Sequence, residues 1–464
     1  MGLLISTIAI IAVTSIGFLL TELYNYYRIY YAVLNWYQFE DALFKHNNIY
    51  RIDVDMVDAD NFVAVILLLK FLNKIYKGKG ILILHIIIIG RVFSSENAPS
   101  ISNSNKMIAF EDEKGDKLEI DSVSFFKDIN NIAQGHDFKY DKTESEMLKG
   151  ICAAQLRVLL SSLGFEENIH FKMYDGGIPT LPGINHKIHM LEFYRLCFIN
   201  STLTDTLKIK QKQEDWFNMT RYKRKEEFRG IYDSIQVNKT LLPLSTFNDM
   251  CYSFINKLKP LVIYGAGPCT PLKDFPDDLA RRVAYYAAMS TAWDGTQNIL
   301  GTCFNNAVDF EATKTVFNNM FPFAVILLIP TETCKLPDFI PTPKQIDTIV
   351  EYANVSDAAI KVKEIQDQWN TYKGSSQPIF DVFPILPISY LFEYFLVHQV
   401  KINMSGTNPK YPEGHILHLI SMMLENCGDV STRDIIHRGI TCATHKKNDT
   451  QASNYIEDIG GMLK

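Results

Sequence analysis

Apolar residues along this chain come in short and long runs separated by polar stretches. Short runs lie at residues 81–90, 258–268 and 323–330, with a less regular one at 170–177, and residues 49–53, Ile-Tyr-Arg-Ile-Asp, also look like a short buried strand. Continuous runs of this length, closed by Gly or Pro, are typical of strands covered on both faces. Helical patterns predict helices at residues 62–76, 151–165, 274–293, 312–320 and 383–398. This alternation predicts an α/β fold with an open, mainly parallel sheet and flanking helices.

The first apolar run, residues 2–21, carries no charge and is rich in Ile and Leu. About 20 apolar residues suffice to cross a bilayer as a helix. A secretory signal peptide is the alternative, but it needs a basic segment before a shorter apolar core, and no Lys or Arg precedes this run. Tyr and Trp crowd residues 24–37, as aromatic residues do at a membrane interface. An ordinary aromatic helix packed on the globular body is the other interpretation of that segment.

We therefore predict three parts in the chain. Residues 1–22 form a transmembrane anchor, residues 23–45 an aromatic-rich juxtamembrane helix, and residues 46–464 one α/β domain. Two polar stretches, near 94–146 and 203–240, are predicted to be insertions in that domain.

Composition excludes one class of function and favours one kind of cellular compartment. The chain has 464 residues and a formal net charge of −6, which excludes a strongly basic nucleic-acid binder, so no nucleic-acid partner is expected. Its eight Cys form no Cys-x-x-Cys pair, and a chain of this size does not need disulfides for stability. Free thiols favour a reducing compartment, so we expect a single-pass protein of an organellar membrane. The mitochondrial inner membrane is favoured over the secretory pathway.

Acidic residues gather between the first predicted strand and the first predicted helix, at Asp53, Asp55, Asp58 and Asp60. Ligands of open α/β sheets bind at the carboxyl ends of the strands, so these positions are candidates for chemistry. Carboxylates that converge there repel one another unless a cation or protons lie among them. A solvated acidic loop that caps the helix is the other interpretation. His85, inside an apolar strand, is expected to be a core residue and not a ligand.

The order of segments resembles the inosine–uridine-preferring nucleoside hydrolase family, as a divergent, membrane-anchored member. Residues 53–60, Asp-Val-Asp-Met-Val-Asp-Ala-Asp, resemble that family's Asp-x-Asp-Pro-Gly-x-Asp-Asp motif. Residues 90–91, Gly-Arg, stand at a Gly-Asn of the family, and residues 267–272 resemble its Gly-Pro-Leu-Thr-Asn-Leu. Residues 303–313 resemble Glu-Phe-Asn-x-x-x-Asp-Pro-Glu-Ala-Ala, and residues 380–381 resemble a His-Asp pair. These matches follow the family's order over residues 48–400.

The resemblance implies a nucleoside-hydrolase-like, Rossmann-like fold and hydrolysis of the N-glycosidic bond of a ribonucleoside. In that family a Ca²⁺ ion holds the ribose diol and a water molecule, and an Asp takes the proton of the water. Asp55 matches the catalytic base, which is also a metal ligand. Asp60 and Asp381 match carboxylate ligands, Thr270 matches a residue whose backbone carbonyl binds the ion, and Asn305 matches a ribose contact.

The chain departs from the family at other positions of the sugar- and base-binding pocket. Ala59 replaces an Asp that contacts the ribose, and Cys303 replaces a Glu at the 5′ side of the sugar. Phe380 replaces a His beside the leaving base, and Arg91 replaces an Asn near the ion. The metal-binding set is therefore kept, while most of the set that binds nucleoside is lost.

Arg91 leaves two arrangements open. Either a Ca²⁺ ion lies among Asp55, Asp60, Asp381 and the Thr270 carbonyl, or Arg91 pairs with the carboxylates. A guanidinium stays charged, and it repels a calcium ion in the same small space. We expect Arg91 to take the place of the ion.

Two functions of different classes follow, and the sequence leaves open whether the domain is an enzyme. The favoured one is a catalytically degenerate nucleoside-hydrolase-like domain that contacts other membrane-protein subunits through its anchor and insertions. The alternative is an active, calcium-dependent ribonucleoside N-glycosidase tethered to a membrane. A nucleoside is a partner only in the second case.

Overall fold

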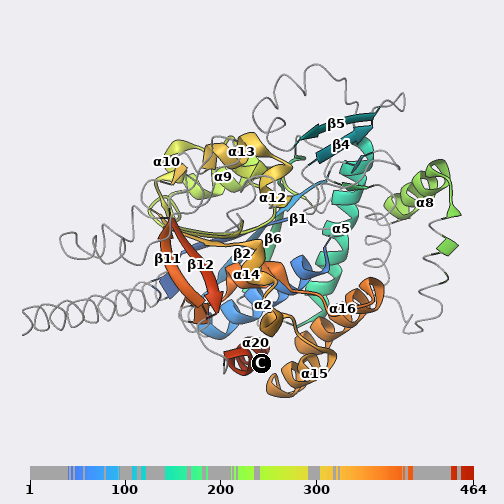
Figure 1. Cartoon of the computed structure of the whole chain (residues 1–464). Coiled ribbons are helices and arrows are strands. Elements are labelled where there is room, and N and C mark those ends of the chain that lie inside the picture. Colours follow the sequence, from blue (N-terminus) through green and yellow to red (C-terminus); the bar gives the residue numbers. More distant parts are fainter. Residues whose placement is uncertain are drawn as a thin grey trace, which may run out of the picture.

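The computed structural model defines a sheet of eight strands with helices on both faces (Figure 1). It describes residues 40, 43–44, 48–55, 58–77, 80–91, 93–94, 107–111, 117–121, 142–164, 169–179, 184–185, 211, 214–215, 218–234, 241–290, 304–316, 320–321, 324–388, 390–391, 395–400, 440–446 and 451–464. The predicted anchor and most of the predicted juxtamembrane helix lie outside these residues. Among the helices that the structure describes, none is long and apolar enough to span a bilayer.

Strand order across the sheet is β11-β12-β10-β9-β8-β1-β2-β6. All neighbours pair in parallel except β11 and β12, which are antiparallel. In that order the strands are Phe395–Val400, Ile440–Lys446, Val325–Ile329, Val283–Met289, Leu261–Ala266, Ile49–Asp55, Leu82–Ile89 and Ile169–Asp175. The predicted open, mainly parallel α/β sheet is confirmed. Two small ribbons lie outside it, one of Phe93–Ser94 (β3) with Ile184–Asn185 (β7) and one of Met107–Glu111 (β4) with Lys117–Asp121 (β5).

Alternate side chains of the central strand β1 point to the two opposite faces of the sheet. Tyr50, Ile52 and Val54 of β1 belong to the larger apolar core, and Ile49 belongs to the smaller core on the opposite face. Side chains alternate in this way along any strand. In β1 the smaller-core face also carries Arg51 and Asp53, so this strand is polar on one face although it is buried throughout.

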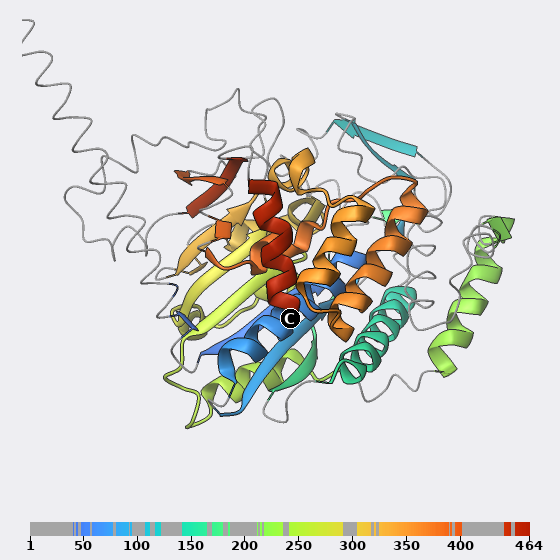
Figure 2. The same cartoon turned by 90° about the horizontal axis from the view of Figure 1, so that it is seen from below.

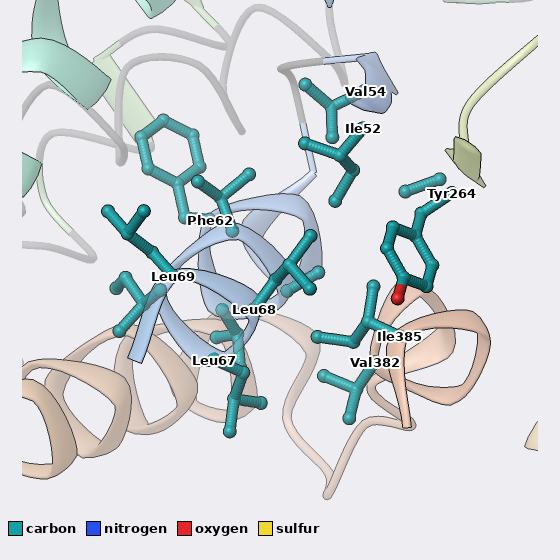
Figure 3. Packing of buried hydrophobic residues seen from close by; sticks show 14 of the residues in the cluster. Ile52, Val54, Phe62, Leu67, Leu68, Leu69, Tyr264, Val382 and Ile385 are labelled. Carbon is teal, nitrogen blue, oxygen red and sulfur yellow. The ribbon is translucent and has the colours of Figure 1, made fainter. Parts of the chain in front are cut away.

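Helices α2, α5, α15, α16 and α20 and the 3₁₀ helix η5 supply side chains to the larger core. Their bounds are Ala59–Tyr76, Lys142–Ser162, Pro343–Tyr352, Asp357–Lys373, Gln451–Leu463 and Phe380–Ile385. In Figure 3, Leu67 and Leu68 of α2 lie toward Val382 and Ile385 of η5, whereas Phe62 and Leu69 lie on the other side of the helix. Burial of each such side chain contributes about 1.5–3 kcal/mol to stability. Two short elements, α14 (Thr331–Cys334) and η4 (Pro337–Phe339), extend this layer.

A second layer covers the other face and lies above the sheet in Figure 1. Figure 2, seen from below, shows the larger-core helices α2, α15, α16 and α20 in front. The second layer contains α9 (Leu244–Tyr252), η2 (Thr270–Leu272), α10 (Asp277–Ala280) and α13 (Phe310–Thr315), with α12 (Phe304–Ala307) directly before α13. Helix α8 (Arg221–Ser234) lies to one side of both layers, next to α5.

One predicted helix is wrong and another is only partly confirmed. Residues 274–293 form only the short α10 before the chain becomes strand β9. In the segment 383–398 the chain passes from η5 to helical residues at 388, 390 and 391, but it is strand β11 from Phe395. An apolar run does not distinguish a buried strand from a buried helix. Residues 283–289, Val-Ala-Tyr-Tyr-Ala-Ala-Met, lie between β8 and β10, where Val and Tyr suit a strand covered on both faces.

Other boundaries also differ from the prediction. Helix α5 begins at Lys142 and not at residue 151, so the predicted insertion near 94–146 holds the ribbon of β4 and β5 and then the first turn of α5. The second stretch, near 203–240, contains α8. The helix predicted at 312–320 corresponds to α13, which begins earlier, at Phe310, and the described residues 316 and 320 beyond it are helical as well. The division of the chain into an anchor, a juxtamembrane helix and one domain stays a prediction.

Candidate functional site

The candidate site lies where the strand order reverses. From β1 the chain proceeds outward through β2 to β6, and then returns to the other side of β1 as β8. Such a switch point opens a crevice at the carboxyl ends of the two central strands, which is where doubly wound sheets bind ligands. Asp55 ends β1, and residues 267–270 follow the end of β8.

A glycine brings these two strand ends close together. A Cβ atom at Gly267 would lie 2.9 Å from the backbone nitrogen of Asp55 and 3.3 Å from its Cβ. A side chain at this position would push the ends of β8 and β1 apart. Gly267 therefore allows the end of β8 to lie directly against Asp55.

Arg91, two residues beyond β2, forms an ion pair with Asp55 at this edge. Its Nε and Nη2 donate hydrogen bonds of 2.9 and 2.6 Å to Asp55 Oδ2, and Nη2 also donates to Asp58. Asn61, in the first turn of α2, donates a 2.9 Å bond to Asp55 Oδ1. Both carboxylate oxygens of Asp55 are thus engaged by protein donors. The expected pairing of Arg91 with carboxylates is present, and its partners are Asp55 and Asp58.

Burial is the largest influence on the pKa values of Asp55 and Arg91. It raises the pKa of Asp55 to about 6, although Arg91 and Asn61 act in the opposite direction. Burial lowers the pKa of Arg91, but the carboxylates of Asp55 and Asp58 outweigh this effect and raise it, so the guanidinium keeps its charge. The pair is a buried ion pair joined by charge-assisted hydrogen bonds.

Two further carboxyl groups lie buried next to this pair. They are Asp60 in the first turn of α2 and Asp381 in the first turn of η5. Their Oδ1 atoms have no hydrogen-bond partner among the described residues. Burial raises the pKa of both groups strongly, and repulsion between them and from Asp55 and Asp58 adds to this rise.

The residues that match the family's calcium ligands do not fit the ion as they are arranged here. Asp55, Asp60 and Asp381 do lie together, but Arg91 holds Asp55 Oδ2 and brings a permanent positive charge. Within the described part of the chain, no three His, Cys, Asp or Glu side chains are placed to hold a metal ion. The hydroxyl of Thr270 is buried without a hydrogen-bond partner there.

The remaining predicted positions separate into three cases. Asn305 is buried beyond the carboxyl end of β9, where its Nδ2 donates a 3.3 Å hydrogen bond to the Met289 carbonyl. Phe380 is partly buried against the larger core, with Lys335 Nζ 6.0 Å from its ring centroid. Cys303 lies outside the described residues.

Sequence reasoning missed a second polar group at the same edge. Lys149 is a buried residue of α5, and its Nζ lies 2.6 Å from Asp175 Oδ1 at the end of β6. The Gly177 backbone nitrogen donates a 2.8 Å bond to the same Asp175 oxygen. A Cβ atom at Gly90 would lie 3.7 Å from Lys149 Cδ, so this group adjoins Arg91. The run predicted at 170–177 contains Asp175, but nothing in the sequence pointed to Lys149, which is distant from it along the chain.

Comparison with known proteins gives structural neighbours. No family model matches the chain, and no curated protein matches it. Among solved structures, a purine-preferring ribonucleoside hydrolase from Gardnerella vaginalis is 11% identical, with a TM-score of 0.47 and coverage of 89% of this chain and 98% of that chain. An inosine-uridine preferring nucleoside hydrolase from Bacillus anthracis is 12% identical, with a TM-score of 0.45 and coverage of 89% and 99%. The type III effector protein XopQ, complexed with adenosine diphosphate ribose, is 10% identical, with a TM-score of 0.40 and coverage of 93% and 98%.

Proposed function

We propose that this chain carries a nucleoside-hydrolase-like domain that does not hydrolyse nucleosides and that acts as an accessory subunit of a membrane protein assembly. The proposal that the domain does not hydrolyse nucleosides rests on the pairing of Arg91 with Asp55 and Asp58. The proposed membrane role rests on the apolar residues 2–21 and the aromatic residues that follow them.

The pairing opposes catalysis in two ways. A general base must offer a free oxygen within hydrogen-bond reach of the water it deprotonates, but Asp55 Oδ2 already accepts two bonds from Arg91. Arg91 also supplies the positive charge among these carboxylates that Ca²⁺ supplies in the family that the sequence resembles. The guanidinium has no open coordination position, so it activates no water.

Loss of substrate contacts adds to this effect. Ala59, Cys303 and Phe380 stand at positions where the resemblance implies polar contacts to the nucleoside. Each lost polar contact costs about 1–3 kcal/mol of binding. Losses of this size at several positions reduce turnover below a useful rate.

The alternative is an active, calcium-dependent ribonucleoside hydrolase. One observation favours it: the Oδ1 atoms of Asp60 and Asp381 and the Thr270 hydroxyl are buried without hydrogen-bond partners among the described residues. Buried carboxylate oxygens of this kind suit a hard cation. Under this alternative, Arg91 would have to leave Asp55 before an ion enters.

The first prediction is that the purified full chain with CaCl₂ releases no base from inosine or uridine above the rate without protein. Base release, followed by chromatography, is compared with that of an Asp55→Ala variant, which reports any contaminating hydrolase. Equal traces for both proteins support a degenerate domain. Turnover by the wild-type chain that disappears in Asp55→Ala would establish the enzyme instead.

A further inference from the structure

The loop that joins α9 to β8, residues 253–260, exposes a cluster of large apolar side chains. Phe254 is 84% exposed, Ile255 is 77% exposed and Leu258 is 87% exposed. Ile81, directly before β2, is 70% exposed. Large exposed apolar groups gathered in one place mark an interaction surface, whereas single ones need no explanation.

Hydrogen bonds fix the backbone of this loop from the inside. Arg282 donates to the carbonyls of Cys251, Asn256 and Lys259 at 3.0, 2.6 and 2.9 Å. The Asn256 side chain donates a 3.2 Å bond to the Met250 carbonyl. The apolar side chains are therefore held outward by an ordered turn and do not collapse onto the core.

The position of the loop points to its partner. The Ile49 backbone nitrogen, at the start of β1, donates a 2.9 Å hydrogen bond to the Pro260 carbonyl at the end of the loop. The start of β1 thus lies directly beside the loop, and in the sequence it follows the predicted membrane segment. Ile81 lies at the same end of the sheet, because β2 pairs in parallel with β1.

Charged groups around the loop suit a lipid headgroup layer. Lys257 Nζ lies 4.9 Å from the centroid of the Phe254 ring, and Arg281 is exposed nearby, before β9. An acidic residue is also nearby: the Tyr252 hydroxyl donates a 2.7 Å hydrogen bond to the Asp278 carboxylate. Apolar and aromatic tips next to cations are typical of surfaces that lie in the membrane interface.

We propose that Phe254, Ile255 and Leu258 insert into the interfacial layer of the bilayer to which the N-terminal segment attaches the chain, with Ile81 beside them. The inference rests on the proposed membrane attachment but is independent of catalysis. It fixes the orientation of the domain: the amino ends of β1, β2 and β8 face the lipid, and the carboxyl ends with Asp55 and Arg91 face away from it.

Tryptophan probes test this inference on the full chain in phosphatidylcholine–phosphatidylglycerol vesicles whose acyl chains carry bromine, a short-range quencher. Phe254→Trp and Leu258→Trp place the probe in the loop. Tyr222→Trp is the matched control, since Tyr222 is exposed on α8, away from α9 (Figure 1). The signal of the wild-type chain is subtracted from each.

We expect the bromolipid to cause a loss of emission from the loop probes and none from the control. Loop probes that are quenched by aqueous iodide as strongly as the control would overturn the inference. Probes shielded from both iodide and bromolipid would overturn it too, in favour of a protein partner. Carbonate extraction of the same vesicles tests attachment separately: a chain that stays in the pellet with water-exposed loop probes refutes the loop insertion alone.

Discussion

Arg91 is the residue at which this chain departs most from the family that its sequence resembles. It pairs with two of four clustered carboxyl groups, Asp55 and Asp58. The other two, Asp60 and Asp381, are buried and form no ion pair with the residues that the structure describes. Removal of one partner from a buried ion pair is far more costly than absence of both, because the remaining charge is left unpaired.

The second prediction follows from this asymmetry. Arg91→Asn should lower the free energy of unfolding by about 3–5 kcal/mol in chelator, and added Ca²⁺ should restore part of the loss. The wild-type chain should unfold at the same temperature with and without Ca²⁺. Thermal unfolding with CaCl₂ or chelator measures both effects, and Arg91→Lys, which keeps the charge, is the control. Stabilisation of the wild-type chain by Ca²⁺ would show that the ion binds beside Arg91.

A separate buried polar group lies on the smaller-core face of β1 and β2. Arg51 pairs with Asp53 through two hydrogen bonds of 2.6 and 2.9 Å, and His85 Nδ1 lies 2.9 Å from the Tyr174 hydroxyl. Burial lowers the pKa of His85 to about 3, and the positive charges of Lys172 and Arg51 add to this. His85 is therefore neutral in the folded chain, in keeping with a core role.

The third prediction concerns pH. The unfolded chain binds a proton at His85 below pH 6.5 and the folded chain only below about 3. The unfolded state thus binds more protons in this interval, so stability falls on acidification from 6.5 toward 3, with a slope of up to about 1.4 kcal/mol per pH unit. Urea unfolding across this range, for wild type and His85→Gln, isolates the contribution as a difference. A difference that stays constant with pH would contradict it.

At the scale of elements, one helix crossing depends on a glycine. A Cβ atom at Gly460 of α20 would lie 2.5 Å from Tyr352 Cβ and 3.0 Å from the Ile349 carbonyl of α15. At the neighbouring Gly461, such an atom would meet nothing within 4 Å. The two glycines share one helix and differ only in what faces them.

The fourth prediction uses this contrast. Gly460→Ala should destabilise the domain by about 1–3 kcal/mol, because α20 must move away from α15. Gly461→Ala should stabilise it by up to about 1 kcal/mol, since Ala favours a helix more than Gly does. Chemical unfolding of both variants gives the comparison. Equal effects of the two substitutions would show that α20 does not pack closely on α15.

The elements that the sequence predicts well are those with distinct patterns. The strands that became β2, β8 and β10 are continuous apolar runs bounded by Gly, Pro or charge, and the structure confirms them. It also confirms β1, whose apolar residues alternate with charged ones. Strand β9 was missed because its apolar run follows a Pro and two acidic residues that mimic a helix start. Pairing across long stretches of sequence, as between β10 and β12, leaves no local pattern to read.

The residues of the candidate site could also be predicted only in part. Asp55, Asp60, Asp381 and Arg91 were found by their positions after strands and by resemblance, and the structure brings them together. Asn61 and Lys149 were not found, because their roles depend on which donor reaches which carboxylate in space. An Asn or Lys within a helical pattern is ordinarily a solvated residue, so its type alone does not indicate such a role.

At the scale of the whole molecule, the two ends of the sheet have different characters. The carboxyl ends carry the buried acidic and basic groups, and the amino ends carry the exposed apolar loop. A domain attached to a membrane at its amino-end side presents its opposite edge and the helical layers on its flanks to other proteins. Pairs of small residues with three other residues between them favour self-association of membrane helices. Such pairs are few in residues 2–21, so heterologous partners are expected.

The fifth prediction tests this role. Alkaline carbonate extraction of native membranes should leave the full chain in the pellet, because a spanning helix is not removed by pH or salt. After solubilisation in mild detergent, the chain should elute with other polypeptides in a particle larger than a homodimer. Release by carbonate would refute the spanning helix. Elution as a monomer or homodimer would refute the accessory-subunit role and favour the tethered hydrolase, because an enzyme on a membrane tether needs no assembly to act.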